Sequence, residues 1–161
     1  NMASPQQVLI AKDIATQKYE GARHLLNVTF PMVKDPKLLL GVIHNLSDSL
    51  EGSMDAILAY ERLLRLIPIH NDTYESRFNI FRMKSVRRNN ISPEAIHLMS
   101  ELKFILDLHK KSPMEFQRGN RFVICNKDYQ LKVISIKDIQ KYLSTTKSLL
   151  DQMQKIVSKY L

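Results

Sequence analysis

The longest run of patterned hydrophobic residues lies between Asp35 and Ile67 and predicts a helix of about nine turns. Its apolar residues recur at steps of three and four, which places them on one stripe: Leu39, Val42, Ile43, Leu46, Leu50, Ile57, Leu64 and Ile67. Asp35 can accept hydrogen bonds from the first free amides, Pro36 suits the first helical position, and Pro68 marks the predicted end. So long a stripe must be covered by other parts of the chain.

A first helix is predicted over residues 5–33, because Ser4 and the proline after it repeat the same start signal before apolar residues with helical spacing. Pro31 has no amide proton, so we expect a kink or an early end at residues 27–29. The connection at residues 34–35 is very short. The two long helices must therefore run antiparallel.

Small side chains are expected to let these two helices approach closely. Folding about the short turn brings Ala11 and Ala15 opposite residues 54–58. The second helix carries small residues in this region: Gly52, Ser53, Ala56 and Ala59. We therefore expect an interaxial distance toward the short end of the usual range of roughly 8–10 Å.

Three further helices are predicted, from Thr73 to about Arg87, from Pro93 to about Lys110, and from Ser135 to the C-terminus. Each begins beside a serine, threonine or aspartate side chain that can accept a hydrogen bond from the first free amides. The three segments bring the number of predicted helices to five.

The region before the last helix has a different pattern. Residues 121–125 are β-branched and aromatic, residues 126–128 read as a turn, and residues 129–134 alternate in hydrophobicity with period two. We predict a β-hairpin that packs one apolar face on the helices, because an isolated hairpin is marginal in water. The predicted fold is therefore all-α: an up-and-down helical bundle of about five helices with a small β-hairpin, at about 121–134, before the last helix.

One domain spanning residues 1–161 is expected, because a chain of this length can bury a sufficient core without metals or disulfides. The single cysteine, Cys125, reads as a small buried hydrophobe. We expect a cytoplasmic protein, because neither a signal-like segment nor an apolar run of about 18 residues is found. Asn1 precedes what reads as a start methionine, so we expect it to be foreign to the chain and residues 1–3 to be disordered.

The net charge of +8 lies entirely in the second half of the chain. Residues 1–70 hold seven basic and seven acidic side chains, whereas residues 71–161 hold seventeen and nine. Such a half can bind phosphates, although a solvated surface that keeps the protein soluble is the commoner reason for this charge. The candidate nucleic-acid-binding residues are Arg82, Arg87, Arg88, Lys110, Lys111, Arg118 and Arg121.

A second hypothesis rests on Arg65-Leu-Ile-Pro-Ile-His70. This spacing resembles the R-x(4–6)-H motif of the HEPN superfamily, helical-bundle proteins that include metal-independent ribonucleases acting as dimers. By that resemblance Arg65 holds the scissile phosphate, and His70 acts on the attacking 2′-hydroxyl or the leaving group. The sequence departs from the superfamily at Leu66, where a polar residue is frequent, and at Pro68, which breaks the helix between the two residues.

Other catalytic classes have little support, because the chain contains no glycine-rich phosphate loop, no HExxH motif and no pair of cysteines for zinc. No Glu-x-x-His pair of the di-metal carboxylate type is found, so we predict neither a metal nor a cofactor. The hairpin, taken with Tyr60-Glu-Arg62, also resembles a family of small uncharacterised archaeal helical proteins, and that resemblance implies no activity.

The sequence thus favours a non-enzymatic intracellular binding or assembly module that forms a homodimer, because helices of nearly 30 residues leave long apolar flanks to cover. The alternatives are a nucleic-acid-binding protein that uses the basic second half and a HEPN-like ribonuclease. No membrane partner is expected.

Overall fold

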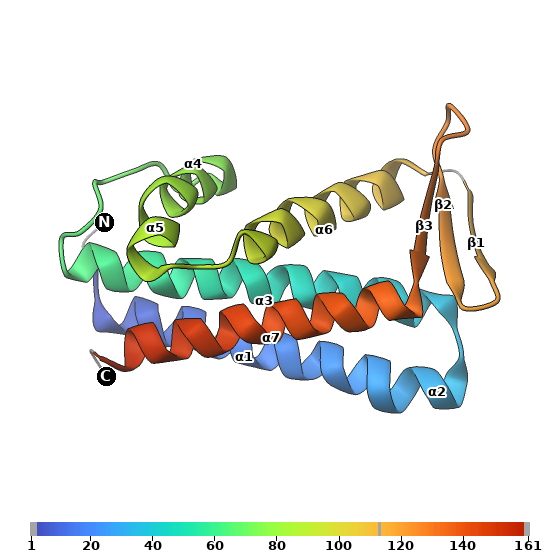
Figure 1. The fold of residues 1–161 in the computed structure, drawn as a ribbon, viewed down its shortest axis with the longest axis horizontal. Helices are drawn as coiled ribbons and strands as arrows, with labels where there is room; N and C mark the ends of the chain where they lie inside the picture. The colour runs from blue at the N-terminus through green and yellow to red at the C-terminus, as the bar shows by residue number, and fades with distance from the viewer. Residues whose placement is uncertain (1–2, 113, 160–161) are drawn as a thin grey trace.

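Four long helices run alternately up and down the molecule (Figure 1): α1 (Pro5–His24), α3 (Pro36–Leu63), α6 (Pro93–Lys111) and α7 (Ile136–Ser158). This computed structural model describes residues 3–112 and 114–159, so the expectation for residues 1 and 2 lies outside the described residues. The predicted all-α fold, with a small antiparallel β element before the last helix, is confirmed.

The helices begin at the predicted caps, because each capping side chain takes a hydrogen bond from a free amide of the first turn. Ser4 accepts from Gln7, and Asp35 accepts from Lys37. Ser135 forms a capping box with Asp138, in which each side chain bonds the other residue's backbone amide. These signals are local, so tertiary structure does not displace them.

The first helical stretch runs over residues 5–33, as predicted, and it does not end at residues 27–29, where a kink or an early end was expected. It continues through the π-helical turn η1 (Leu25–Thr29) into the short helix α2 (Phe30–Val33). The amide of Phe30 donates to the carbonyl of Leu25, five residues back, which widens the helix by one residue. Pro31 then stands at the start of α2, where its missing amide costs little.

The second long helix ends at Leu63 and not at Ile67, because a Schellman motif stops it. Arg65 adopts a left-handed conformation with φ of 56°, and its amide bonds the carbonyl of Arg62. The next amide, of Leu66, reaches back to the carbonyl of Glu61. The apolar spacing continues beyond this point, but the backbone turns away.

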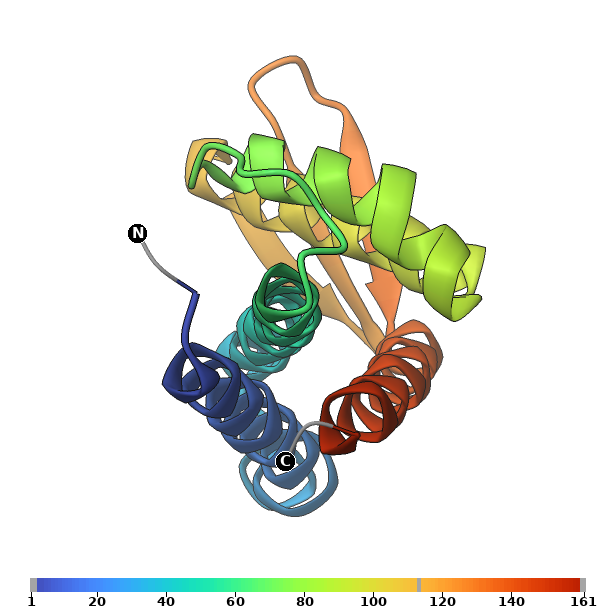
Figure 2. The same ribbon diagram turned by 90° about the vertical axis from the view of Figure 1, so that its left-hand side faces the viewer.

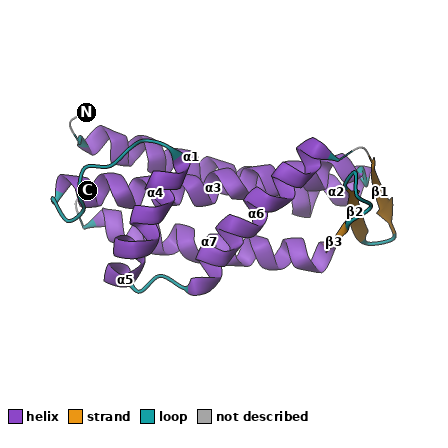
Figure 3. Cartoon of the chain, turned by 90° about the horizontal axis from the view of Figure 1, so that it is seen from above, coloured by secondary structure: helices purple, strands orange, loops and turns teal. Residues whose placement is uncertain are grey.

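Two groups of helices enclose the core. Viewed from its end, the molecule has α1, α3 and α7 on one side, and α4 (Tyr74–Ile80), η2 (Phe81–Ser85), α5 (Val86–Asn89) and α6 on the other (Figure 2). From above, α6 crosses the long helices obliquely (Figure 3). The largest fully buried side chains come from both groups and from the sheet: Phe81, Leu39, Ile43, Leu46, Leu50, Met54, Ile57, Leu102, Ile105, Ile124, Ile134 and Ile139.

The β element is a three-stranded antiparallel sheet of order β1-β2-β3, and not the predicted two-stranded hairpin. Its strands are β1 (Met114–Arg118), β2 (Arg121–Cys125) and β3 (Leu131–Ser135). The sequence pattern does not predict β1, because its residues do not alternate clearly. The glycine at the turn is the remaining signal: Gly119 and Asn120 form a two-residue turn with φ of 61° at the glycine.

The third strand begins later than predicted, because Asn126 accepts hydrogen bonds from the amides of Asp128 and Gln130 and holds a longer loop. One apolar face of the sheet packs on the helices, as predicted, through Phe122, Ile124 and Ile134.

Candidate functional site

The seven cations proposed for nucleic-acid binding do not form one surface. Arg82, Arg87 and Arg88 lie on η2 and α5, near the first turns of α6, whereas Lys110 and Lys111 lie at the other end of α6. That helix has 19 residues and is about 28 Å long, so the two groups lie near its opposite ends. Arg118 and Arg121 flank the β1–β2 turn, at the opposite end of the strands from the point where α6 leads into the sheet (Figure 1).

A groove of about 700 Å³ lies between the η2–α5 segment and the first turns of α6, and we call it the basic groove. Its lining residues are Phe78, Arg82, Met83, Lys84, Val86, Arg87, Pro93, Ile96, His97 and Ser100. They include three permanent cations, one histidine and no carboxylate. The remaining side chains are mostly apolar, so the groove combines an apolar surface with positive charge.

Among the described residues, 3–112 and 114–159, the groove cations Arg82, Lys84 and Arg87 form no ion pair with a carboxylate. Arg82 donates instead to the side-chain oxygen of Asn79, at 3.1 Å. Lys84 and His97 were not among the residues proposed from sequence, although Lys84 belongs to the same basic run.

The π-helical turn η2 determines which residues of this segment face the groove. The amide of Val86 bonds the carbonyl of Phe81, five residues back, and Phe81 and Ser85 at the ends of the turn are buried. The three residues between them are exposed, and Met83 is 62% exposed. Such widened turns are frequent at functional sites in helices.

Arg88 belongs to a different environment from Arg87. Its guanidinium donates to the carboxylate of Glu61 at 2.7 Å and to the carbonyl of Leu66 at 2.9 Å. Glu61 is only 1% exposed and also accepts hydrogen bonds from Ser85 and Asn89. Arg88 therefore joins α5 to the end of α3, and the structure gives it a role in the fold.

A second charged cluster joins α3 to α4 and α6. Arg77 donates to Asp55 at 2.5 Å and to Glu51 at 3.1 Å, and Lys103 donates to Glu51 at 2.9 Å. Burial acts to raise the pKa of each carboxyl group, that of Glu51 and that of Asp55. For Glu51 the hydrogen bonds and charges of Lys103 and Arg77 outweigh burial and lower its pKa, whereas for Asp55 burial prevails and the pKa is raised. Burial also raises the pKa of Tyr74 to about 12.

The motif residues Arg65 and His70 are not in one cavity. His70 lines a cavity of about 390 Å³ together with Arg62, Asp72 and Arg77, and Arg65 is not among its lining residues. The Nδ1 atom of His70 is buried and has no hydrogen-bond partner within the described part of the chain. Arg65 is exposed in the turn that ends α3. The HEPN-like ribonuclease stays a prediction.

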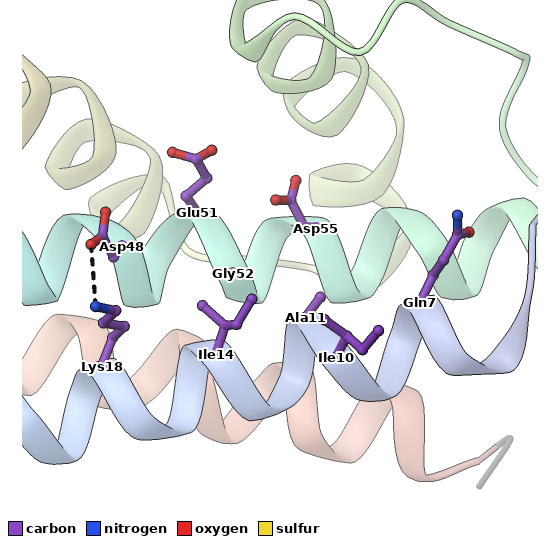
Figure 4. A pocket seen from close by; sticks show the side chains of 9 residues that line it. All are labelled: Gln7, Ile10, Ala11, Ile14, Lys18, Asp48, Glu51, Gly52 and Asp55. Atoms are coloured by element: carbon purple, nitrogen blue, oxygen red, sulfur yellow. Dashed lines mark ion pairs between the residues drawn. The ribbon is translucent and has the colours of Figure 1, made fainter. Parts of the chain in front are cut away.

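A cleft of about 400 Å³ lies between α1 and α3 (Figure 4). It contains exposed apolar side chains, which are the kind of surface that the predicted homodimer would cover. Ile10 and Ile14 of α1 line it, and they are 53% and 45% exposed. The acidic residues of α3 lie along the opposite wall, where Lys18 of α1 approaches Asp48 at 4.0 Å. The predicted homodimer stays a prediction.

The cations at the sheet end are in part engaged with other side chains. Lys111 pairs with Asp107 at 3.1 Å. Arg118 and Arg121 stand opposite each other in the β1–β2 ladder, and both are exposed. None of Lys110, Lys111, Arg118 and Arg121 lines the basic groove, the cleft between α1 and α3 or the cavity beside His70.

The chain matches no family model, no curated protein and no solved structure. The resemblances to the HEPN superfamily and to small archaeal helical proteins therefore stay predictions. Within the described residues, no cluster of three or more His, Cys, Asp or Glu side chains is arranged to hold a metal ion. In the same part of the chain, no helix is both long enough and apolar enough to cross a membrane.

Proposed function

We propose that this chain is a non-enzymatic binding protein that holds the phosphate backbone of a nucleic acid in the basic groove. The observation that carries the proposal is the set of cations on its walls, Arg82, Lys84 and Arg87, which have no carboxylate partner within the described residues. Cations of this kind bind phosphates and release the counterions that nucleic acids condense. The positive second half of the chain adds a long-range attraction.

Two further features favour a binding groove over a merely solvated surface. The groove is concave and has apolar side chains between its cations, among them Val86 and Ile96. Two of the cations, Arg82 and Lys84, are also carried by the π-helical turn η2, whose end residues Phe81 and Ser85 are buried. A solvated charged face requires neither feature.

The test is a salt-titrated binding assay with a fluorescently labelled oligonucleotide. Its central variant reverses the three groove charges, as Arg82→Glu, Lys84→Glu and Arg87→Glu. We expect its affinity to fall by at least ten-fold. The slope of log affinity against log salt should become shallower by about two to three units, since three phosphate contacts are lost. Gel analysis of the oligonucleotide after incubation reports cleavage, and intact RNA is expected.

A matched control reverses three charges at the sheet end, as Lys110→Glu, Arg118→Glu and Arg121→Glu. The net charge of this variant equals that of the groove variant, so it separates the groove from the overall field of the protein. We expect less than about a three-fold loss of affinity. Equal losses in the two variants, or no binding by the natural chain at low salt, would contradict the proposal. Specific cleavage of RNA would favour the ribonuclease instead.

The proposal includes a homodimer formed through the exposed apolar side chains of α1. Ile10 and Ile14 are one helical turn apart and present an apolar strip along the cleft of Figure 4. Light scattering coupled to size exclusion at low micromolar concentration should return twice the chain mass of 18.7 kDa. A clean monomer would remove this part of the proposal and leave the groove untouched.

A further inference from the structure

Three side chains, each one helical turn from the next, form a stacked column that leads along α4 into the basic groove. The rings of Tyr74 and Phe78 are 5.7 Å apart at their centroids and 10° from parallel. The guanidinium carbon of Arg82 lies over the Phe78 ring at 5.5 Å from its centroid. At the other end of the column, the ammonium of Lys103 lies 4.4 Å from the centroid of the Tyr74 ring. Arg82 is thus the last planar group before the open groove.

The guanidinium of Arg82 is held in place before any ligand binds. One of its nitrogens donates to the Asn79 side chain, at 3.1 Å, and Phe78 supports one of its sides. The residue is exposed and lines the groove. A planar group fixed in this way loses little conformational entropy when another planar group stacks on it.

Building on the proposed function, we infer that the basic groove takes single-stranded in preference to double-stranded nucleic acid, with an unpaired base stacked on Arg82. Lys84 and Arg87, which lie on the same groove, hold the phosphates on either side of that base. The base extends the column of Tyr74, Phe78 and Arg82 by one planar group. The apolar side chains of Met83 and Ile96 cover its edges.

Single strands are favoured for two physical reasons. In a duplex each base is already stacked on both faces, and removing it from the stack has a free-energy cost that a single strand avoids. Every base of a single strand has an accessible π-face, and base stacking on planar side chains is tolerant of sequence. A groove that bound only the outside of a duplex would need cations but no apolar side chains between them.

An acidic peptide is another ligand that carries negative charge. It has carboxylates for Lys84 and Arg87 but no planar group to continue the column, so the stacked arrangement of Arg82 favours the nucleic acid. A poly-glutamate competitor separates the two in the same assay.

The deciding experiment changes the shape of residue 82 without changing its charge. Arg82→Lys keeps the cation and removes the planar group, and Arg118→Lys, at an exposed arginine outside the groove, is the matched control. For a single-stranded oligonucleotide, we expect Arg82→Lys to weaken binding about five-fold or more with an unchanged salt slope, and Arg118→Lys to change it less than about two-fold. For a duplex of the same sequence, the natural chain should bind at least about ten-fold more weakly, and Arg82→Lys should make no difference.

The inference would be overturned by equal affinity for single strand and duplex, by equal effects of the two lysine variants, or by displacement of the oligonucleotide by poly-glutamate at the same charge concentration. In the first two cases, loss of binding on reversing the three groove charges would still support the proposed function. No binding of any oligonucleotide would overturn both. Thermal unfolding of both lysine variants checks that the fold is intact, since Arg82 is exposed and each variant should melt with the natural chain.

Discussion

Ala15 and Gly52 bring the first two long helices together so closely that a β-carbon on Gly52 would lie 3.0 Å from the backbone nitrogen of Ala15 and 3.1 Å from its α-carbon. The hydroxyl of Ser49, one turn away, donates to the carbonyl of Ala15 at 2.8 Å. The close approach predicted from the small residues of both helices is confirmed here. Gly52 is therefore a position of tight packing in α3.

Gly52→Ala should therefore destabilise the protein. The added methyl group meets backbone, which cannot move aside as a side chain can. The overpacking cost of about 1–3 kcal/mol is offset in part by the roughly 1 kcal/mol that alanine gains over glycine in a helix, so a net loss of up to about 2 kcal/mol is expected. Urea denaturation measures the change. The control is Gly21→Ala in α1, where the nearest atom is the side-chain nitrogen of Asn45 at 3.2 Å, so the variant should be neutral or more stable. Similar effects at both positions would show that the contact is not tight.

Arg88→Met should lower the stability of the fold much more than Arg87→Met, although the two residues are neighbours. Loss of Arg88 leaves the buried carboxylate of Glu61 without its cation, and the expected destabilisation is about 3 kcal/mol. Arg87 is exposed and has no ion pair in the described structure, so its loss should change stability by less than about 0.5 kcal/mol. Chemical denaturation of both variants gives the comparison, and equal stabilities would argue against the Glu61 network.

Arg65→Gly should make the protein more stable. Arg65 has a left-handed backbone conformation that costs a side-chain-bearing residue about 1–2 kcal/mol, whereas glycine adopts it freely. The greater freedom of glycine in the unfolded chain offsets part of this gain, so an increase of up to about 1 kcal/mol is expected. Thermal and urea unfolding provide the measurement. A clear loss of stability would mean that the Arg65 side chain contributes contacts beyond its role in the turn.

The two carboxylates that share Arg77 should respond to pH in opposite directions. The pKa of Glu51 is lowered below its ordinary 4.5, so its contribution to stability is present above that pH and is lost as the pH falls through the folded-state value. The pKa of Asp55 is raised above its ordinary 3.8, so its contribution is present below that pH and is lost as the pH rises through the folded-state value.

Glu51→Gln and Asp55→Asn test this pair by urea denaturation from roughly pH 3 to 7. The stability that Glu51→Gln loses relative to the natural chain should grow with pH, whereas the loss in Asp55→Asn should shrink. Carbon NMR titration of the two carboxyl groups in the natural chain would check the directions independently. Parallel pH profiles in the two variants would contradict the assigned shifts.

The sequence predicts those features of the fold that are set by local hydrogen bonds or by a short connection between two helices. The helix starts at Ser4, Asp35 and Ser135 follow from side chains that bond amides within three residues, and the meeting of Ala15 with Gly52 follows from the short turn between two long helices. The end of α3 was misplaced because hydrophobic spacing continues past the Schellman motif, which is a property of backbone conformation.

The candidate site was predictable only in part. Arg87 and Arg88 are equivalent in the sequence, and what separates them is Glu61, 27 residues from Arg88. Which of them lines the basic groove depends on the widened turn η2, and no hydrophobic pattern in the residues of that turn indicates it. The sequence therefore indicates a basic region, and the tertiary contacts distinguish the cations that line the groove from Arg88, which pairs with Glu61.

The widened turn at Phe81–Ser85 also has a consequence for ancestry. A π-helical turn contains one residue more than the α-helical path that it replaces, as a single-residue insertion would leave behind. A relative that lacks the insertion should align with this chain only across a one-residue gap in this segment. Beyond the gap its side chains would be rotated by about 100° about the helix axis, and the residue aligned with Arg87 would leave the groove. Such a gap in an alignment would therefore mark where the lineage acquired its groove.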